Sequence, residues 1–180
     1  SASIEVISPE GVFIPVGFGN FTLKPEEVRD INLSGVDLGK KTFALKITGS
    51  EPIIASIFTE VKKGPLSDFM WSSPAQPFGN VSLNLYGLEP TFSFAGERIQ
   101  IDITWRDNRG KSGSKTLIGE EIVNWKVPAN TRLITIVNRS GSVGGMSWIT
   151  QDGITHLPIA LSTNLESATK PIADISVIQP

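Results

Sequence analysis

One histidine, one aspartate and two serines are the residues whose types and spacing come closest to a catalytic set. His156 is the only histidine of the chain, Asp152 lies four positions before it, and Ser142 and Ser147 precede both. An imidazole oriented by a carboxylate can deprotonate a serine hydroxyl, so these residues are candidates for a hydrolase triad. The segment around Ser142, however, reads Ser-Gly-Ser-Val-Gly and lacks the nucleophile elbow of the hydrolases. The simpler interpretation is a hairpin turn at Asp152 leading into a strand that carries a structural His156.

The acidic residues are too scattered for glycoside hydrolysis or for metal binding. Glu120 and Glu121 are adjacent, so in a strand they point to opposite faces. Asp102 and Asp107 could offer oxygen ligands to calcium, but the loop beside them carries four basic side chains that would repel a cation. These are Arg106, Arg109, Lys111 and Lys115. With no cysteine and one histidine in the chain, we expect no metal and no cofactor.

The charge pattern gives no basis for binding nucleic acid. The chain has 16 basic and 18 acidic side chains, a net charge of −2. Its basic loop has no interleaved aromatic residues, and the glycine-rich segment 141–145 lacks the Lys-Ser/Thr that completes a phosphate-binding loop. No uninterrupted apolar run is long enough to cross a membrane. We therefore expect neither nucleic-acid binding nor membrane insertion.

Large apolar side chains in segments without clear periodicity are the most informative feature. Segment 67–79, which we expect to be a long loop, contains four of them, namely Phe69, Met70, Trp71 and Phe78. If exposed, such residues form contact patches for another subunit or a ligand, and if buried they close the end of a sandwich. Arg109 and Lys111 are the candidates for a polar rim, and Trp148, three residues after a pair of glycines, is a candidate for stacking on a sugar.

The composition and the apolar alternation predict the elements that must position these residues. Ile (21) and Val (12) outnumber Leu (13) and Ala (9), and the 17 Gly and 12 Pro imply many turns. β-Branched side chains favour pleated strands, so an all-β domain is expected. The clearest alternation is at 98–106, where isoleucines and Trp105 share one face. A hairpin loop at 107–114 should follow it, then a strand from 115 to 118 or a little beyond.

The other expected strands follow the same logic. They are 4–7, 12–16, 42–48, 53–61, 81–85, 91–95, 122–127, 131–138, 146–150, 154–161 and 172–178. These thirteen candidate segments, expected to make ten to twelve short strands separated by turns, predict a single domain, 1–180, with an antiparallel β-sandwich of jelly-roll or immunoglobulin-like type. One short helix is expected at 24–30, where Pro25 and two acids suit a helix start, and a further turn at 162–170.

Three functions of different classes fit these features. In general character (all-β, free of cysteine, rich in Ser and Thr, with long apolar loops) the chain is similar to viral coat and coat-projection domains. This similarity implies a non-enzymatic structural or attachment module in a virion or another surface assembly. Its partners would be like subunits or a host receptor, including a receptor glycan. The alternatives are a carbohydrate-binding domain and a small Ser-His-Asp hydrolase.

Overall fold

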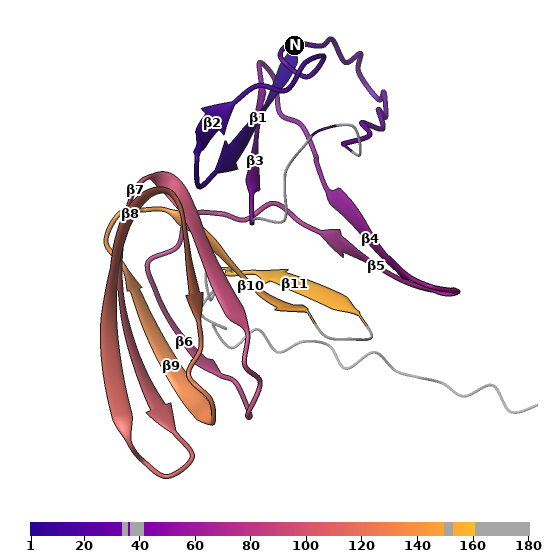
Figure 1. Ribbon diagram of the computed structural model, residues 1–180. Helices are drawn as coiled ribbons and strands as arrows, with labels where there is room; N and C mark the ends of the chain where they lie inside the picture. The colour runs from indigo at the N-terminus through magenta and orange to yellow at the C-terminus, as the bar shows by residue number, and fades with distance from the viewer. Residues whose placement is uncertain (34–35, 37–41, 150–152, 161–180) are drawn as a thin grey trace, which may run out of the picture.

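The chain folds into antiparallel β-sheets (Figure 1). The computed structural model describes residues 1–33, 36, 42–149 and 153–160, and within them it contains eleven strands and no helix. The all-β, sandwich-like architecture expected from the sequence is confirmed. The largest sheet is curled into a half-barrel rather than laid flat. The segments 162–170 and 172–178, expected to hold a turn and a strand, lie outside the described residues.

The first sheet is N-terminal and has the strand order β2-β1-β3. Its strands are β1 (Ala2–Ser8), β2 (Gly11–Phe13) and β3 (Ala44–Gly49). Ala2, Ile4 and Val6 alternate along β1 and are buried, as period-two patterning requires. The segment after β2 closes over this strand, because Ile4 N donates to the Phe18 carbonyl oxygen at 3.1 Å. β1 also contacts β8 of the largest sheet, so the two sheets pack together.

The second sheet is a two-stranded hairpin of β4 (Ile57–Lys63) and β5 (Leu66–Ser72). Seven successive residue pairs join its strands without a register shift. Gly64 forms the tip with φ +60°, a left-handed conformation that costs glycine little. In Figure 1 the hairpin extends away from the other sheets.

The third sheet holds six strands and the main core. They are β6 (Asn80–Asn84), β7 (Thr91–Asp107), β8 (Ser112–Lys126), β9 (Thr131–Asn138), β10 (Val143–Ile149) and β11 (Ile154–Pro158). Strand β7 is shared: its first half pairs with β10, its second half with β9, and β8 follows it along both halves. This shared strand is what curls the sheet on itself (Figure 1).

A β-bulge in β7 allows both halves of this curled strand to contribute side chains to one core. Gly96 pairs with Glu121, but the next pair joins Ile99 to Gly119, so two residues of β7 oppose one of β8. The extra residue changes which side chains face inward. Phe94 before the bulge and Ile101 after it are therefore both fully buried, although they differ in parity.

The core lies inside the curled sheet. Its buried members are Phe78, Leu85, Phe92, Phe94, Ile99, Ile101, Ile103, Leu117, Trp125, Val127, Ile134, Ile136 and Ile159. Phe92 links the aromatic members, with its ring centroid 6.2 Å from that of Phe94 and 6.0 Å from that of Trp125. Trp105 packs against this cluster while remaining partly exposed, which agrees with its expected place on the apolar face of its strand.

Several expected strands differ in extent. Segments 91–95 and 98–106 form one long strand, β7, and segments 115–118 and 122–127 form another, β8. The halves of each strand are separated by the bulge and not by a turn. Segment 53–61 is not a central strand: Ile53 and Ile54 are exposed, and pairing begins only at Ile57. Segment 67–79 is not a loop throughout, since its first part belongs to β5.

The helix expected at 24–30 is a turn instead. Glu27 N donates to the Lys24 carbonyl oxygen at 3.2 Å, and Glu26 adopts φ +63°. Pro25 with a following positive φ is the pattern of a type II turn, and a positive φ interrupts a right-handed helix. The Glu27 carboxylate accepts a hydrogen bond from Lys24 N at 2.8 Å and closes the turn. All side chains of 24–30 are exposed, so a helix of one or two turns there would gain little from packing on the described residues to offset its nucleation cost.

Candidate functional site

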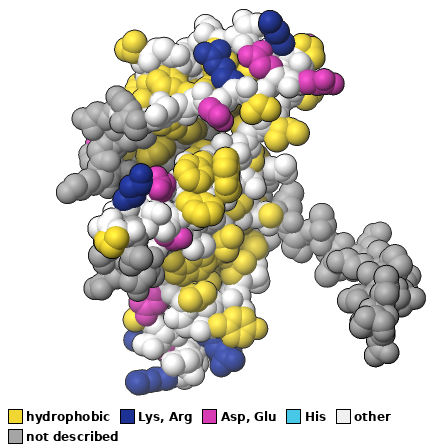
Figure 2. All heavy atoms as spheres, turned by 90° about the vertical axis from the view of Figure 1, so that its right-hand side faces the viewer, with side chains coloured by type: hydrophobic (Ala, Val, Ile, Leu, Met, Phe, Trp, Pro, Cys, Tyr) yellow, Lys and Arg dark blue, Asp and Glu magenta, His cyan; other side chains and the backbone are white. Residues whose placement is uncertain are grey.

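Three aromatic side chains form an exposed cluster on the β4–β5 hairpin. Phe58, Phe69 and Trp71 are 50%, 61% and 64% exposed. The Phe58 ring centroid lies 5.1 Å from that of Trp71 and 5.8 Å from that of Phe69, with the rings tilted by 55° and 32°. We call these three residues the aromatic cluster. Figure 2 views the side of the molecule from which the hairpin extends in Figure 1, and hydrophobic side chains gather across the middle of that side.

The register of the hairpin places the cluster on one face. Phe58 pairs with Trp71 and Glu60 pairs with Phe69, and residues directly opposite each other in a ladder share a face. Met70 points to the other face and is half-buried. One side of the hairpin therefore faces solvent with aromatic residues, while the other packs on the protein.

Asp68 fastens the hairpin to the third sheet. Its Oδ2 accepts a hydrogen bond from Ile154 N at 3.0 Å, at the start of β11. A Cβ built on Gly153 would overlap this carboxylate, so the close approach requires glycine. Asp68 was not among the sequence-based candidates. Asp68 is the one charged residue of segment 66–71, and this isolated charge in a mostly apolar segment could have identified it from the sequence.

The predicted contact residues divide into exposed and buried members. Phe69 and Trp71 are exposed as the contact hypothesis requires, but Met70 is half-buried on the opposite face of the hairpin. Phe78 is only 4% exposed and belongs to the core, with its ring centroid 6.2 Å from that of Phe94. Phe78 is therefore not a surface contact residue, and Phe58 takes its place.

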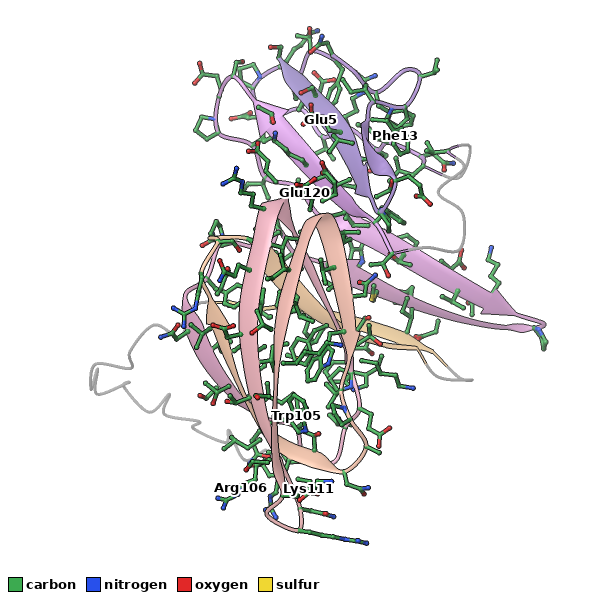
Figure 3. All side chains as sticks on the ribbon, turned by 60° about the vertical axis from the view of Figure 1, so that its left-hand side comes forward. Glu5, Phe13, Trp105, Arg106, Lys111 and Glu120 are labelled. Carbon is green, nitrogen blue, oxygen red and sulfur yellow. The ribbon has the colours of Figure 1, made fainter. Side chains whose placement is uncertain are left out.

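The basic residues lie elsewhere on the molecule. Arg109 and Lys111 are exposed in the β7–β8 turn, where Asp107 Oδ1 accepts hydrogen bonds from their backbone N–H groups at 2.9 and 2.8 Å. In Figure 3 Lys111 lies at the tip of the β7–β8 hairpin, and Glu120 lies at the bend of the hairpin, opposite the bulge. In Figure 1 this turn is far from the β4–β5 hairpin, so Arg109 and Lys111 do not border the aromatic cluster. The charged residues on the cluster's own face are Glu60 and Lys62.

Asp102 is an ion-paired surface acid. Its carboxylate accepts hydrogen bonds from Arg139 Nε and from Thr116 Oγ1, the latter at 2.7 Å. The hydrogen bond from Arg139 has the largest effect and lowers the pKa of Asp102 below its usual value, and the bond from Thr116 lowers it further. The carboxylate is thus held ionised by its neighbours, which suits a structural role.

The structure separates Ser142 from His156 but places Ser147, the other candidate serine, opposite His156 in the ladder. Ser142 is 4% exposed and hydrogen-bonds to Asn138 Oδ1 at 3.2 Å. His156 pairs across the strands with Ser147. Ser147 is five residues from Ser142, which is roughly 17 Å along an extended strand. Ser142 is therefore not placed to act as a nucleophile for His156. Asp152 lies outside the described residues.

His156 itself lies between β10 and solvent. Its imidazole covers Gly145, where any Cβ would overlap the ring. Partial burial lowers the pKa of His156 below its usual value of 6.5, because the charged imidazolium is less well solvated there. Burial thus favours the neutral imidazole over the imidazolium. Ser147 lies directly opposite His156 in the ladder, and its hydroxyl donates to the Thr91 carbonyl oxygen at 3.5 Å.

Asn138 organises the turn between β9 and β10, a role that sequence reasoning missed. Its Nδ2 donates to the carbonyl oxygens of Phe78 and Ser142 at 2.9 and 2.7 Å. Its Oδ1 accepts from the hydroxyls of Ser140 and Ser142 at 3.0 and 3.2 Å. Because Ser142 is a member of this network, it is a structural serine.

Trp148 is not an open stacking platform. Its indole is half-buried on β10, and Nε1 is enclosed without a hydrogen-bond partner. It shares a strand face with Met146, which packs against the core. An inward-facing indole does not present a free ring face to a sugar.

Within the residues that the structure describes, no cluster of three or more His, Cys, Asp or Glu side chains suits a metal ion. That same part of the chain has no helix with the length and hydropathy needed to span a membrane. Comparison with protein-family models, with curated proteins and with solved structures finds no match. The aromatic cluster is thus the feature on which a functional argument can be built.

Proposed function

We propose that this chain is a non-enzymatic structural or attachment module whose β4–β5 hairpin contacts a neighbouring protein surface. The observation that carries the proposal is the aromatic cluster, three large rings that pack on one another yet remain half or more exposed. Aromatic side chains are enriched at the centres of protein interfaces, where they supply most of the binding energy.

The size of the cluster supports an interface. Side chains of this type bury about 150–250 Å² each, so the exposed fractions correspond to roughly 350 Å² of apolar surface. Covering it releases on the order of 9 kcal/mol of transfer free energy, before the cost of association is subtracted. Patches of this size on a soluble protein are often functional.

The ring geometry favours a protein partner over a carbohydrate. A sugar stacks on an open, flat aromatic face, but Phe58 lies against Trp71 at 55° and covers part of its surface. The tilted packing leaves less flat ring face open to a sugar, while the exposed apolar area remains available to a protein surface. The setting that we propose is a capsid, a capsid projection or another large surface assembly, with like subunits or a receptor as the partner.

The substitution Trp71→Ala tests this proposal. We expect association, measured by sedimentation velocity across a range of concentrations, to weaken about 30-fold, as for a central interface residue contributing about 2 kcal/mol. The fold should persist, because the ring contact with Phe58 contributes only about 1 kcal/mol. Phe13→Ala is the matched control, since Phe13 is an exposed aromatic residue on β2 of the first sheet (Figure 3).

Two results would contradict the proposal. If Trp71→Ala unfolds the protein, the ring contributes to the core and is not a contact residue. If Trp71→Ala leaves association unchanged but abolishes binding on a glycan array, the carbohydrate-binding alternative replaces the proposal.

A further inference from the structure

The outer edge of β4 has unused backbone hydrogen-bonding groups. β4 pairs with β5 along one edge, and no backbone hydrogen bond joins its other edge to another described segment. A two-stranded ribbon is marginally stable by itself in water, and this one is supported by β11, which contacts β5, but by no third strand paired to β4 among the described residues. An open edge of this kind is a template for strand addition.

The β4 edge has no bulge or register shift of the kind that interrupts pairing elsewhere in the fold, but it carries the charges of Glu60 and Lys62, which any added strand must match. The long edge strand β8 is distorted opposite the bulge of β7, where Glu121 adopts φ +61°, and it contacts β1. In contrast, the ladder of β4 runs through seven pairs without a register shift. The side chains of β4 therefore decide which strand can add to it.

We propose that β4 pairs antiparallel with β4 of a second copy of this chain, about a two-fold axis at Val61, to form a four-stranded sheet from two hairpins. This inference rests on the proposed function in taking the hairpin as the contact element, and it identifies the partner. A two-fold contact uses the same strand of both copies and closes without leading to a filament.

The order of charges along β4 selects this register. With the axis at Val61, Glu60 of each copy lies opposite Lys62 of the other, which makes two cross-strand ion pairs. Moving the axis by one residue places Glu60 opposite Glu60, or Lys62 opposite Lys62, and like charges directly opposite are destabilising. Within one chain Glu60 Oε2 and Lys62 Nζ already lie 3.2 Å apart, so both charged groups point to one face of the strand.

Pairing in this register enlarges the aromatic surface. Glu60 and the aromatic cluster share one face of the hairpin, so the clusters of both copies lie on the same face of the joined sheet. The combined exposed apolar area is roughly 700 Å², close to the ~800 Å² that each partner contributes to a standard interface. The dimer would thus present a full-sized contact surface that a single copy lacks.

Two charge-reversal variants that rescue each other test the pairing. Glu60→Lys and Lys62→Glu each place like charges opposite one another in the homodimer, so each alone should dimerise at least about ten-fold more weakly than the parent. In an equimolar mixture, the basic positions 60 and 62 of one variant face the acidic positions 62 and 60 of the other. We expect the mixture to recover the parent dimer, at twice the 19.4 kDa mass of one chain, in sedimentation velocity at low ionic strength.

Mixing also serves as the control for effects within one chain. Each variant loses its own Glu60–Lys62 ion pair, and mixing cannot restore it, so recovery reports a contact between copies. A parent chain that stays at the monomer mass at its highest soluble concentration overturns the inference, as does a mixture that does not dimerise. If Trp71→Ala weakens association but the mixture fails, the pairing is wrong and the proposed function stands. If the mixture dimerises while Trp71→Ala has no effect, the pairing stands and the proposed role of the aromatic cluster fails.

Discussion

The substitution Asp68→Ala tests whether one side-chain hydrogen bond sets the position of the β4–β5 hairpin. Asp68 Oδ2 and Ile154 N are 3.0 Å apart, although the residues are 86 positions apart in the sequence. Hydrogen bonds to charged groups contribute about 1.5–3 kcal/mol, and alanine would leave the Ile154 N–H without its acceptor. Because Asp68 is half-exposed and water can replace part of the interaction, we expect a loss of about 2 kcal/mol.

Hydrogen exchange of the Ile154 amide measures this loss directly. A change of about 2 kcal/mol in local opening corresponds to roughly 30-fold faster exchange in Asp68→Ala. Asp68→Asn is the matched control, because its amide oxygen can accept the same bond without the charge, and its exchange should lie between those of the parent and Asp68→Ala. The amide of the buried Ile134 on β9 should be unaffected in both variants. If Ile154 exchanges at the parent rate in Asp68→Ala, this bond does not hold the hairpin.

Two further predictions concern the core and the histidine. Phe78→Ala should lower the free energy of unfolding by about 3–5 kcal/mol in chemical denaturation, because it empties a buried site; a loss comparable with that of Trp71→Ala would place Phe78 at the surface. Burial lowers the pKa of His156 in the folded chain below its unfolded value of 6.5, so the unfolded chain binds the proton more tightly. The contribution of His156 to stability is thus complete above pH 6.5 and is lost as the pH falls below it. Compared with His156→Gln, the parent should lose free energy of unfolding between pH 7 and pH 5, as measured by urea titrations. If the free energies of unfolding of the two proteins depend on pH in the same way, burial does not affect His156.

Residue types and their alternation were sufficient to predict the fold class. The excess of Ile and Val predicted an all-β chain, and the alternation at 131–138 matched β9 (Thr131–Asn138) in full. Such segments can be identified because each has one buried and one exposed face, so the period of two is visible. Segment 66–72 has apolar residues on both faces, with Met70 on one and Phe69 and Trp71 on the other, which conceals the period of a strand.

The tertiary structure alone decided which apolar residues reach the surface. Phe78 and Trp71 looked equivalent in the sequence, since both are large aromatic residues in a segment rich in Ser and Pro. Phe78 is buried because it packs on Phe94 of the curled sheet, whereas no described segment covers the face of the hairpin that carries Trp71. The bulge between Gly96 and Ile99 was equally hidden, because it depends on how two strands pair. Hydrophobicity is a property of each residue, but burial depends on which distant segment packs against it, so only the folded chain separates the core from the contact surface.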